Sequence, residues 1–289
     1  MFDPNKEKTI ISVVICTKDR VEEPVTCIES VLRQTRLPDE VVVIDASATD
    51  SLREVLRESF PAPAAKLVYE QSSPGLTHQR NVSVRIARGD VVFFLDDDVV
   101  LERDYLAEIL KVFEADVAGQ VGGVMGRMTN ARRIRWTLKL FSNVFCLSVP
   151  GDGRFRRSGL ATFRSCEDGG VVPTEFLSGG LVAYHRRVLN EFPWDEALEG
   201  YGLMEDDDFS YRVSRRFRNY YVPTARCVHR ASPLARDGGA ALLQMRLRNH
   251  WYLFRKNFPN SIANRAAFAL SVTGETLLFL YGSIQRLLR

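Results

Sequence analysis

The sequence lacks a charge imbalance and has few cysteines. Its 289 residues include 39 Lys and Arg against 36 Asp and Glu, a formal net charge of +3, so the overall charge predicts no nucleic-acid partner. The five cysteines are odd in number and form no C-x-x-C pair. This argues against a disulfide framework or a zinc site and favours reduced thiols in a protein that faces the cytosol. Residues 1–9 contain no apolar segment, so no secretory signal is predicted.

The first 120 residues alternate apolar, strand-like runs with segments of helical spacing. The expected strands are 10–16, 41–44, 66–70 and 91–95, and the expected helices are 25–33, 51–59 and 77–87. Such alternation implies βαβ units and a mainly parallel sheet in one large α/β domain. Beyond residue 120 the rhythm breaks. A basic and aromatic helix is expected over 132–147, and residues 151–170, rich in Gly, Arg and Ser, are predicted to form a mobile loop.

A strand-like run at 91–95 ends directly on three carboxylates, Asp96, Asp97 and Asp98. Open α/β sheets bind their ligands at the carboxyl ends of strands. Three adjacent acids repel one another, each pair by roughly 1 kcal/mol in water and more near a low-dielectric surface. A divalent cation removes that repulsion, and oxygen ligands favour Mg²⁺ or Mn²⁺. The alternative is an acidic helix N-cap, for which one Asp would suffice.

A second acidic cluster begins at Glu205 and continues through Asp206, Asp207 and Asp208. Two such clusters in one α/β chain suggest two tasks in one cleft, with one binding a cation and the other moving a proton. A general base is a carboxylate whose pKa partial burial raises toward the working pH. The alternative is a charged helix N-terminus. His229 is a candidate metal ligand beside these clusters or, equally, a structural histidine.

Five segments together resemble glycosyltransferase family 2, the inverting GT-A enzymes that use nucleotide-diphospho-sugars. They are SVVICTKDR at 12–20, VVIDASATD at 42–50, GLTHQRN at 75–81, DDD at 96–98, and the pair Glu205-Asp206 with Arg212 behind it. The resemblance covers roughly residues 10–232. It implies a GT-A fold, a Rossmann-like and mainly parallel sheet flanked by helices. Residues 1–235 would form the catalytic domain, with a nucleotide-binding half at 1–118 and an acceptor-binding half at 119–235.

The resemblance also implies roles for individual residues on the nucleotide side. Thr17 and Asp45 would contact the base and ribose, and Arg80 the base or diphosphate. Asp96 would hold the ribose, with Asp97 beside it in the nucleotide site.

For the metal and the chemistry, the resemblance implies that Asp98 ligates a divalent metal, Mn²⁺ or Mg²⁺, which bridges the two phosphates. His229 would complete the metal shell. Asp206 would be the base that deprotonates the acceptor hydroxyl, with Glu205 next to it in the catalytic pair.

Three further residues are candidates for contacts with the sugar or acceptor. Gly179 and Gly180 would allow the backbone to approach a ligand closely, or they would form a simple turn. Trp194 would stack on a sugar ring, although tryptophan is just as often part of a core. The 151–170 loop, with four arginines, would close over the diphosphate or be a solvated basic loop.

The carboxy-terminal segment, residues 236–289, changes character. Residues 242–258 predict a basic, aromatic amphipathic helix of the kind that lies on an anionic membrane. Residues 266–284 are apolar for nearly a bilayer's length but carry Glu275 near the centre, which offsets most of the insertion free energy. We expect a peripheral or partly inserted helix on the cytoplasmic face of the membrane, with pairing in a homo-oligomer or packing on the protein's own core as alternatives.

Together these features predict a metal-dependent inverting glycosyltransferase. It would move a sugar from a nucleotide-diphospho-sugar, with UDP favoured, to a hydroxyl of a lipid-linked or polysaccharide acceptor. A nucleotidyltransferase is a rival, but the segment after the first expected strand has no Gly-rich loop with a lysine. A membrane-bound scaffold that binds nucleotide without turnover is the non-enzymatic alternative.

Overall fold

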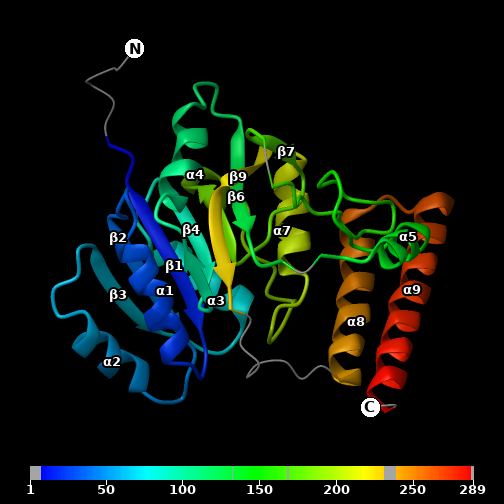
Figure 1. Cartoon of the computed structure of the whole chain (residues 1–289), viewed down its shortest axis with the longest axis horizontal. Coiled ribbons are helices and arrows are strands. Elements are labelled where there is room, and N and C mark those ends of the chain that lie inside the picture. Colours follow the sequence, from blue (N-terminus) through cyan, green and yellow to red (C-terminus); the bar gives the residue numbers. More distant parts are fainter. Residues whose placement is uncertain (1–7, 132, 168, 231–238, 288–289) are drawn as a thin grey trace.

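The computed structural model describes residues 8–131, 133–167, 169–230 and 239–287, and its centre is one nine-stranded sheet (Figure 1). The strands are β1 (Ile11–Thr17), β2 (Glu40–Asp45), β3 (Lys66–Gln71), β4 (Val91–Asp96), β5 (Val99–Leu101), β6 (Val121–Met128), β7 (Val172–Thr174), β8 (Leu181–His185) and β9 (Arg218–His229). Their order is β3-β2-β1-β4-β8-β6-β9-β5, with β7 paired to β9.

Helices flank this sheet and extend beyond one end of it (Figure 1). They are α1 (Glu22–Leu32), α2 (Ser51–Ser59), α3 (Leu76–Ile86), α4 (Tyr105–Glu114), α5 (Trp136–Val144), α6 (Arg186–Glu191), α7 (Glu205–Ser214), α8 (Ala240–Asn257) and α9 (Ile262–Leu287). The helix predicted over 132–147 is therefore shorter than expected.

The sheet has a parallel half and a mixed half. Strands β3, β2, β1 and β4 are parallel neighbours, and the apolar residues of β4 are buried, as expected for a strand covered on both faces. Beyond β4 the sheet is mixed, because β8 is antiparallel to both β4 and β6, whereas β6 and β9 are parallel. The predicted α/β sheet flanked by helices is confirmed; its parallel pairs join β1–β4 and β6 to β9, and antiparallel pairs join the remaining strands.

Register brings the functional segments to one edge. Thr17 pairs with Asp45 and Cys16 with Asp96, so the carboxyl ends of β1, β2 and β4 coincide. At the other end of the strand order, Val99 of β5, which directly follows Asp98, pairs with His229 of β9. This pairing returns the end of β9 to within one residue of the acid triplet, although the two segments are 130 residues apart in the sequence.

The two carboxy-terminal helices lie side by side next to α7, and α5 lies next to α9 (Figure 1). Lys256 and Asn257 of α8 hydrogen-bond to Asp208 of α7. Among the described helices, α9 is long and apolar enough to cross a membrane by length and composition over Ile262–Ser283, and only 17% of its apolar window is buried. The predicted boundary between residues 235 and 236 lies outside the described residues.

Candidate active site

Three potential metal ligands converge at the carboxyl end of β4. One ligand atom from each of Asp96, Asp98 and His229 lies within 4.8 Å of the others, and His229 Nε2 is 2.7 Å from Asp98 Oδ1. Two carboxylates and an imidazole are a donor set that suits Mn²⁺ or a similar divalent cation. The structure therefore brings the two predicted metal ligands together and adds Asp96, which the sequence had suggested only for the ribose.

Asp97 has different surroundings from its two neighbours. The Thr17 hydroxyl donates a hydrogen bond to Asp97 Oδ2 at 2.6 Å, and the Arg20 guanidinium pairs with the other oxygen. Burial raises the pKa of Asp97 to about 6, while the Thr17 hydrogen bond and the Arg20 charge act in the opposite direction. Arg20 was not among the predicted site residues, since a single arginine after a strand carries no recognisable signal.

Arg80 connects the two acidic clusters. Its buried guanidinium forms an ion pair with Glu205 and lies 3.9 Å from Asp96 Oδ1. Two glycines make this approach possible. A Cβ atom on Gly179 would collide with Arg80 and Glu205, and one on Gly180 would collide with the Asp96 carboxylate. The sequence predicted that both glycines would approach a sugar or acceptor; in this structure their backbone lies against the site's own charged side chains.

The second cluster begins helix α7, and Asp206 lines the cleft. Backbone N–H groups of Gly179 and Asp207 donate hydrogen bonds to its carboxylate. Burial raises the pKa of Asp206, opposed first by the charge of Arg80. Burial likewise raises the pKa of Glu205 to about 7 against the pull of Arg80. Of these two acids, Glu205 is bound by an arginine and Asp206 is the better placed to accept a proton.

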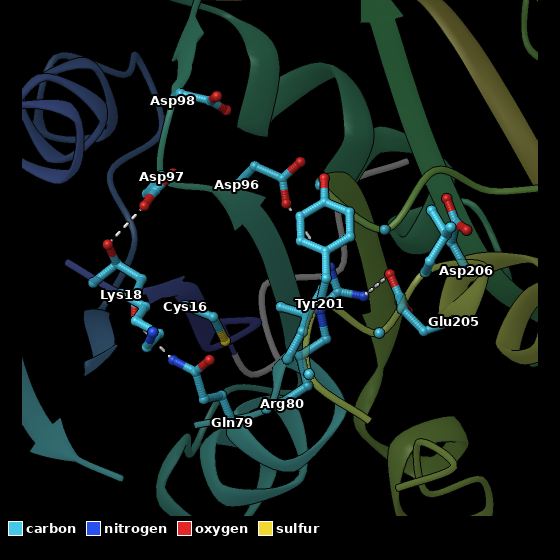
Figure 2. Close-up of a pocket in the computed structure, with 18 of the residues that line it drawn as sticks. Cys16, Lys18, Gln79, Arg80, Asp96, Asp97, Asp98, Tyr201, Glu205 and Asp206 are labelled. Carbon is cyan, nitrogen blue, oxygen red and sulfur yellow. Dashed lines mark hydrogen bonds and ion pairs between the residues drawn. The ribbon is translucent and has the colours of Figure 1, made fainter. Parts of the chain in front are cut away.

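Trp194 does not stack on a ligand in this structure. Its ring is 3% exposed, stacks on Phe209 at 4.2 Å, and donates from Nε1 to Glu205 Oε2 at 3.0 Å. The predicted sugar-stacking role is corrected to a core residue that orients Glu205. The exposed aromatic ring in the cleft belongs instead to Tyr201, 55% exposed, which Figure 2 shows between the two acidic clusters.

Asp45 is also placed differently from the prediction. It is fully buried and does not line the cleft. Its carboxylate accepts hydrogen bonds from Ser47 and from the Tyr69 hydroxyl. Gln79, which the sequence did not single out, lines the cleft and bridges the Thr17 and Ile44 carbonyls at 2.9 Å each. In this structure Asp45 organises the loop after β2, and Gln79 ties β1 to β2.

The cleft that joins these groups has a volume of about 590 Å³, within the usual range for a small-molecule site. Figure 2 shows Asp96, Asp97 and Asp98 on one side and Glu205 and Asp206 on the other. No described residue of the 151–170 loop lines it. That loop packs on α8, where the Ser158 carbonyl lies 2.8 Å from His250 Nε2. The prediction that this loop covers the diphosphate is therefore not supported.

The parallel β1–β4 half-sheet, the mixed second half and the acid triplet at their junction define a glycosyltransferase with the GT-A fold. The chain belongs to Glycosyl transferase family 2, whose model matches residues 12–192. An uncharacterized glycosyltransferase of Bacillus subtilis, YwdF, is 29% identical over 80% of this chain and 78% of its own length. The glycosyltransferase GlyA of Streptococcus pneumoniae is 32% identical over 32% of this chain, a match that spans only 14% of that relative.

Solved structures share the fold at low sequence identity. GalNAc-T7, crystallised with UDP, GalNAc and Mn²⁺, superposes with a TM-score of 0.64 at 18% identity over 87% of this chain and 48% of that one. The mannosyltransferase PcManGT of Pyrobaculum calidifontis, in complex with GDP-Man and Mn²⁺, gives a TM-score of 0.59 at 18% identity over 98% and 81%.

Proposed function

We propose that this enzyme is a metal-dependent inverting glycosyltransferase that uses a nucleotide-diphospho-sugar. The observation that carries the proposal is the placement of two acidic clusters on opposite sides of one cleft (Figure 2). Asp96, Asp98 and His229 form a donor set for a divalent cation, and Asp206 is a partly buried carboxylate of raised pKa. A metal-binding cluster facing a candidate base is what direct transfer between a diphosphate leaving group and a hydroxyl acceptor requires.

In the proposed reaction Asp206 accepts the proton of the acceptor hydroxyl as its oxygen attacks the anomeric carbon. Attack from the face opposite the leaving nucleoside diphosphate forms the new glycosidic bond, breaks the bond to phosphate and inverts the anomeric configuration. A divalent cation bound by Asp96, Asp98 and His229 would neutralise the charge that develops on the leaving diphosphate. Glu205, paired with Arg80, holds the beginning of α7 beside the cleft.

We propose UDP as the first donor nucleotide to test and GDP as its principal competitor. GalNAc-T7 was solved with UDP and PcManGT with GDP-Man. The exposed ring of Tyr201 lines the cleft, and we propose that it stacks on the base or the sugar of the donor.

We further propose a lipid-linked or polysaccharide acceptor reached from the cytoplasmic face of a membrane. Trp136, Leu140 and Val144 form an exposed stripe at four-residue spacing on α5, next to α9, whose Gly274 adjoins Phe145. The exposed apolar residues on α9 include Leu277, and this α5–α9 face suits the interface of a bilayer.

A liposome flotation assay tests the membrane contact. We expect the wild-type protein to float with anionic liposomes and the double variant Trp136→Glu/Leu140→Glu to lose this binding. Dimerisation without liposome binding would assign the face to a second copy of the chain.

The donor proposal is tested by thermal stabilisation with UDP, GDP, dTDP and CDP, each with and without Mn²⁺. A ligand at a hundred times its dissociation constant adds about 2.7 kcal/mol. Stabilisation that needs Mn²⁺ and disappears in Asp98→Asn, but persists in the exposed control Asp50→Asn, supports the metal–diphosphate site. Turnover of the matching nucleotide-sugar then separates an enzyme from a binding scaffold. Metal-independent stabilisation, or none with any nucleotide, contradicts the proposal.

A further inference from the structure

Arg20, in the loop between β1 and α1, lies against two of the three acids at the end of β4. Its side chain is 13% exposed and lines the cleft. Its Nη1 atom pairs with Asp97 Oδ1 at 2.5 Å and lies 3.6 Å from Asp98 Oδ2. The other oxygen of Asp98 is 2.7 Å from His229 Nε2. Both oxygens of this candidate metal ligand therefore face a partner, and one partner carries a permanent positive charge.

The backbone before Arg20 is held in a conformation that directs the chain toward these acids. Asp19 has a left-handed backbone with φ 55°, which a non-glycine residue keeps only where its surroundings hold it. The Asp19 N–H donates to Ser47 Oγ at 2.7 Å, and the Ser47 hydroxyl donates to the buried Asp45 carboxylate at 2.5 Å. The loop after β2 thus fixes the turn that precedes Arg20, and this contact connects Asp45 indirectly to the metal site.

The charges at the end of β4 divide into two sets. Asp97 and Arg20 form a neutral pair, and the carboxylates of Asp96 and Asp98 together balance the two positive charges of Mn²⁺ or Mg²⁺. Arg20 nevertheless also lies beside Asp98. A guanidinium and a divalent cation that share one carboxylate repel each other. The charge of Arg20 therefore opposes a cation bound to Asp98.

We propose that Arg20 is a positioning residue that competes with the divalent cation for Asp98 and so makes tight metal binding depend on the donor diphosphate. Without nucleotide, the charge of Arg20 lowers the affinity of the site for the cation. The negative charge of a bound diphosphate offsets that effect, so metal and nucleotide each raise the affinity of the other by the same factor. The dependence on nucleotide rests on the proposed function, whereas the competition for Asp98 does not.

The first measurement titrates the full chain with Mn²⁺ alone and follows free Mn²⁺ by electron paramagnetic resonance. Arg20→Met removes the charge beside Asp98, so we expect Mn²⁺ to bind about tenfold more tightly than to the wild type. A residue that only supported the metal ligands would have the opposite effect, because loss of support weakens metal binding. Arg20→Lys keeps the charge, and its affinity should stay within about threefold of the wild type.

Lys18→Met is the matched control, because it removes one positive charge from the same cleft. The Lys18 side chain is 51% exposed, lines the cleft and pairs with the exposed Asp19 at 3.0 Å. Solvent screens such a charge, so we expect the affinity for Mn²⁺ to change by less than about twofold. An equal gain in Lys18→Met would assign the effect to the overall charge of the cleft and would overturn the inference.

A double variant shows whether Asp97 acts on the metal through Arg20. Asp97→Asn removes the charged partner of Arg20 and leaves the guanidinium to pair with Asp98, so Mn²⁺ should bind about tenfold more weakly. In Arg20→Met/Asp97→Asn the competing charge is gone, and the affinity should lie within about threefold of that of Arg20→Met. A full tenfold loss from Arg20→Met to the double variant would show that Asp97 acts without Arg20, which contradicts the inference.

The second measurement repeats the Mn²⁺ titration in the presence of UDP or GDP, whichever stabilises the wild type. We expect the nucleotide to raise the Mn²⁺ affinity of the wild type by a factor about ten times larger than in Arg20→Met. The affinities of the two proteins for Mn²⁺ in the nucleotide complex should then agree within about threefold. An equal factor in both proteins would overturn the proposed dependence on the diphosphate.

Mn²⁺ binding that is unchanged or weaker in folded Arg20→Met overturns the competition for Asp98. If Arg20→Met does not fold, Arg20→Gln decides the question, because its amide donates to Asp97 without a charge. The same gain is expected there, and an unchanged or weaker affinity has the same meaning. A wild type that binds Mn²⁺ but no nucleotide contradicts the proposed donor, and the titration with Mn²⁺ alone still decides the role of Arg20.

Discussion

The two acidic clusters have similar sequences and different physical roles. Asp96–Asp98 follow a strand, so their carboxylates gather near one point, and Asp96 and Asp98 meet His229. Residues 205–208 begin a helix, where each successive side chain turns by about 100°. Glu205 therefore pairs with Arg80, Asp206 lines the cleft, and Asp208 hydrogen-bonds to α8.

This contrast shows that the backbone conformation of an acidic run determines which partners its carboxylates contact. A strand end concentrates negative charge, which suits a cation. A helix start spreads the same charge over several partners: cations pair with Glu205 and Asp208, and Asp206 lines the cleft. The second cluster also depends on partners from α3, α8 and α9, whereas the first is assembled within the sheet.

The largest effect that would test this contrast is the loss of the proposed base, Asp206. Asp206→Asn preserves the shape of the side chain but removes its ability to accept a proton. We expect kcat to fall by about 10³, with Mn²⁺-dependent nucleotide binding unchanged, because the metal ligands lie on the other side of the cleft. Steady-state kinetics and thermal shifts measure the two parts. Activity within tenfold of the wild type would show that another group is the base.

Asp208 lies in the same cluster as Asp206, but its replacement is expected to reduce the stability of the fold. Its side chain is 1% exposed and forms ion pairs with Arg212 and Lys256 at 2.9 Å each. Asp208→Ala leaves these cations without their buried partner, so we expect a loss of about 4 kcal/mol in the free energy of unfolding. Urea denaturation measures it, with the exposed Asp50→Ala as the control at near zero. A change below 1 kcal/mol in Asp208→Ala would mean that α8 does not depend on this anchor.

Much of the first cluster was predictable from sequence. An apolar run of strand length that ends in acids, in a βαβ pattern, locates Asp96–Asp98 at the ligand-binding edge. The motifs at 75–81 and 205–206 also identified Arg80 and Asp206, which line the same cleft. The metal roles of Asp98 and His229 fit the geometry, and β5–β9 pairing explains how the histidine comes within reach.

What sequence could not supply is the direction of side chains between elements. Trp194 and Tyr201 are both aromatic residues before the second cluster, yet Trp194 is core and Tyr201 is in the cleft. Asp45 occupies a motif position but is enclosed by Ser47 and Tyr69. Arg246 and Glu275 looked like the basic face of one helix and an interruption of the next. Their pairing exists only once α8 and α9 pack together.

The pH dependence of stability tests Glu205, whose burial raises its pKa to about 7 from an ordinary 4.5. The folded state holds this proton more tightly than the unfolded state, so the contribution is greatest below pH 4.5 and is lost as pH rises to about 7. We expect the stability difference between wild type and Glu205→Gln to fall by on the order of 2 kcal/mol across that window. Parallel curves for the two proteins would show that Glu205 stays ionised beside Arg80.

The smallest predicted effect distinguishes Asp97 from Asp98 within the first cluster. Asp98 is one of the three candidate metal ligands, whereas the Asp97 carboxylate is held by Thr17 and Arg20 next to them. Loss of such a supporting partner weakens metal binding by about tenfold. Asp97→Asn should therefore retain Mn²⁺-dependent nucleotide stabilisation at a roughly tenfold higher Mn²⁺ concentration, and Asp98→Asn should lose it. Equal losses in titrations of both variants would mean that the whole triplet is one metal site. All three carboxylates at the end of β4 would then bind the same cation, whereas the acids at the start of α7 contact separate partners, and the contrast between the two clusters would be sharper.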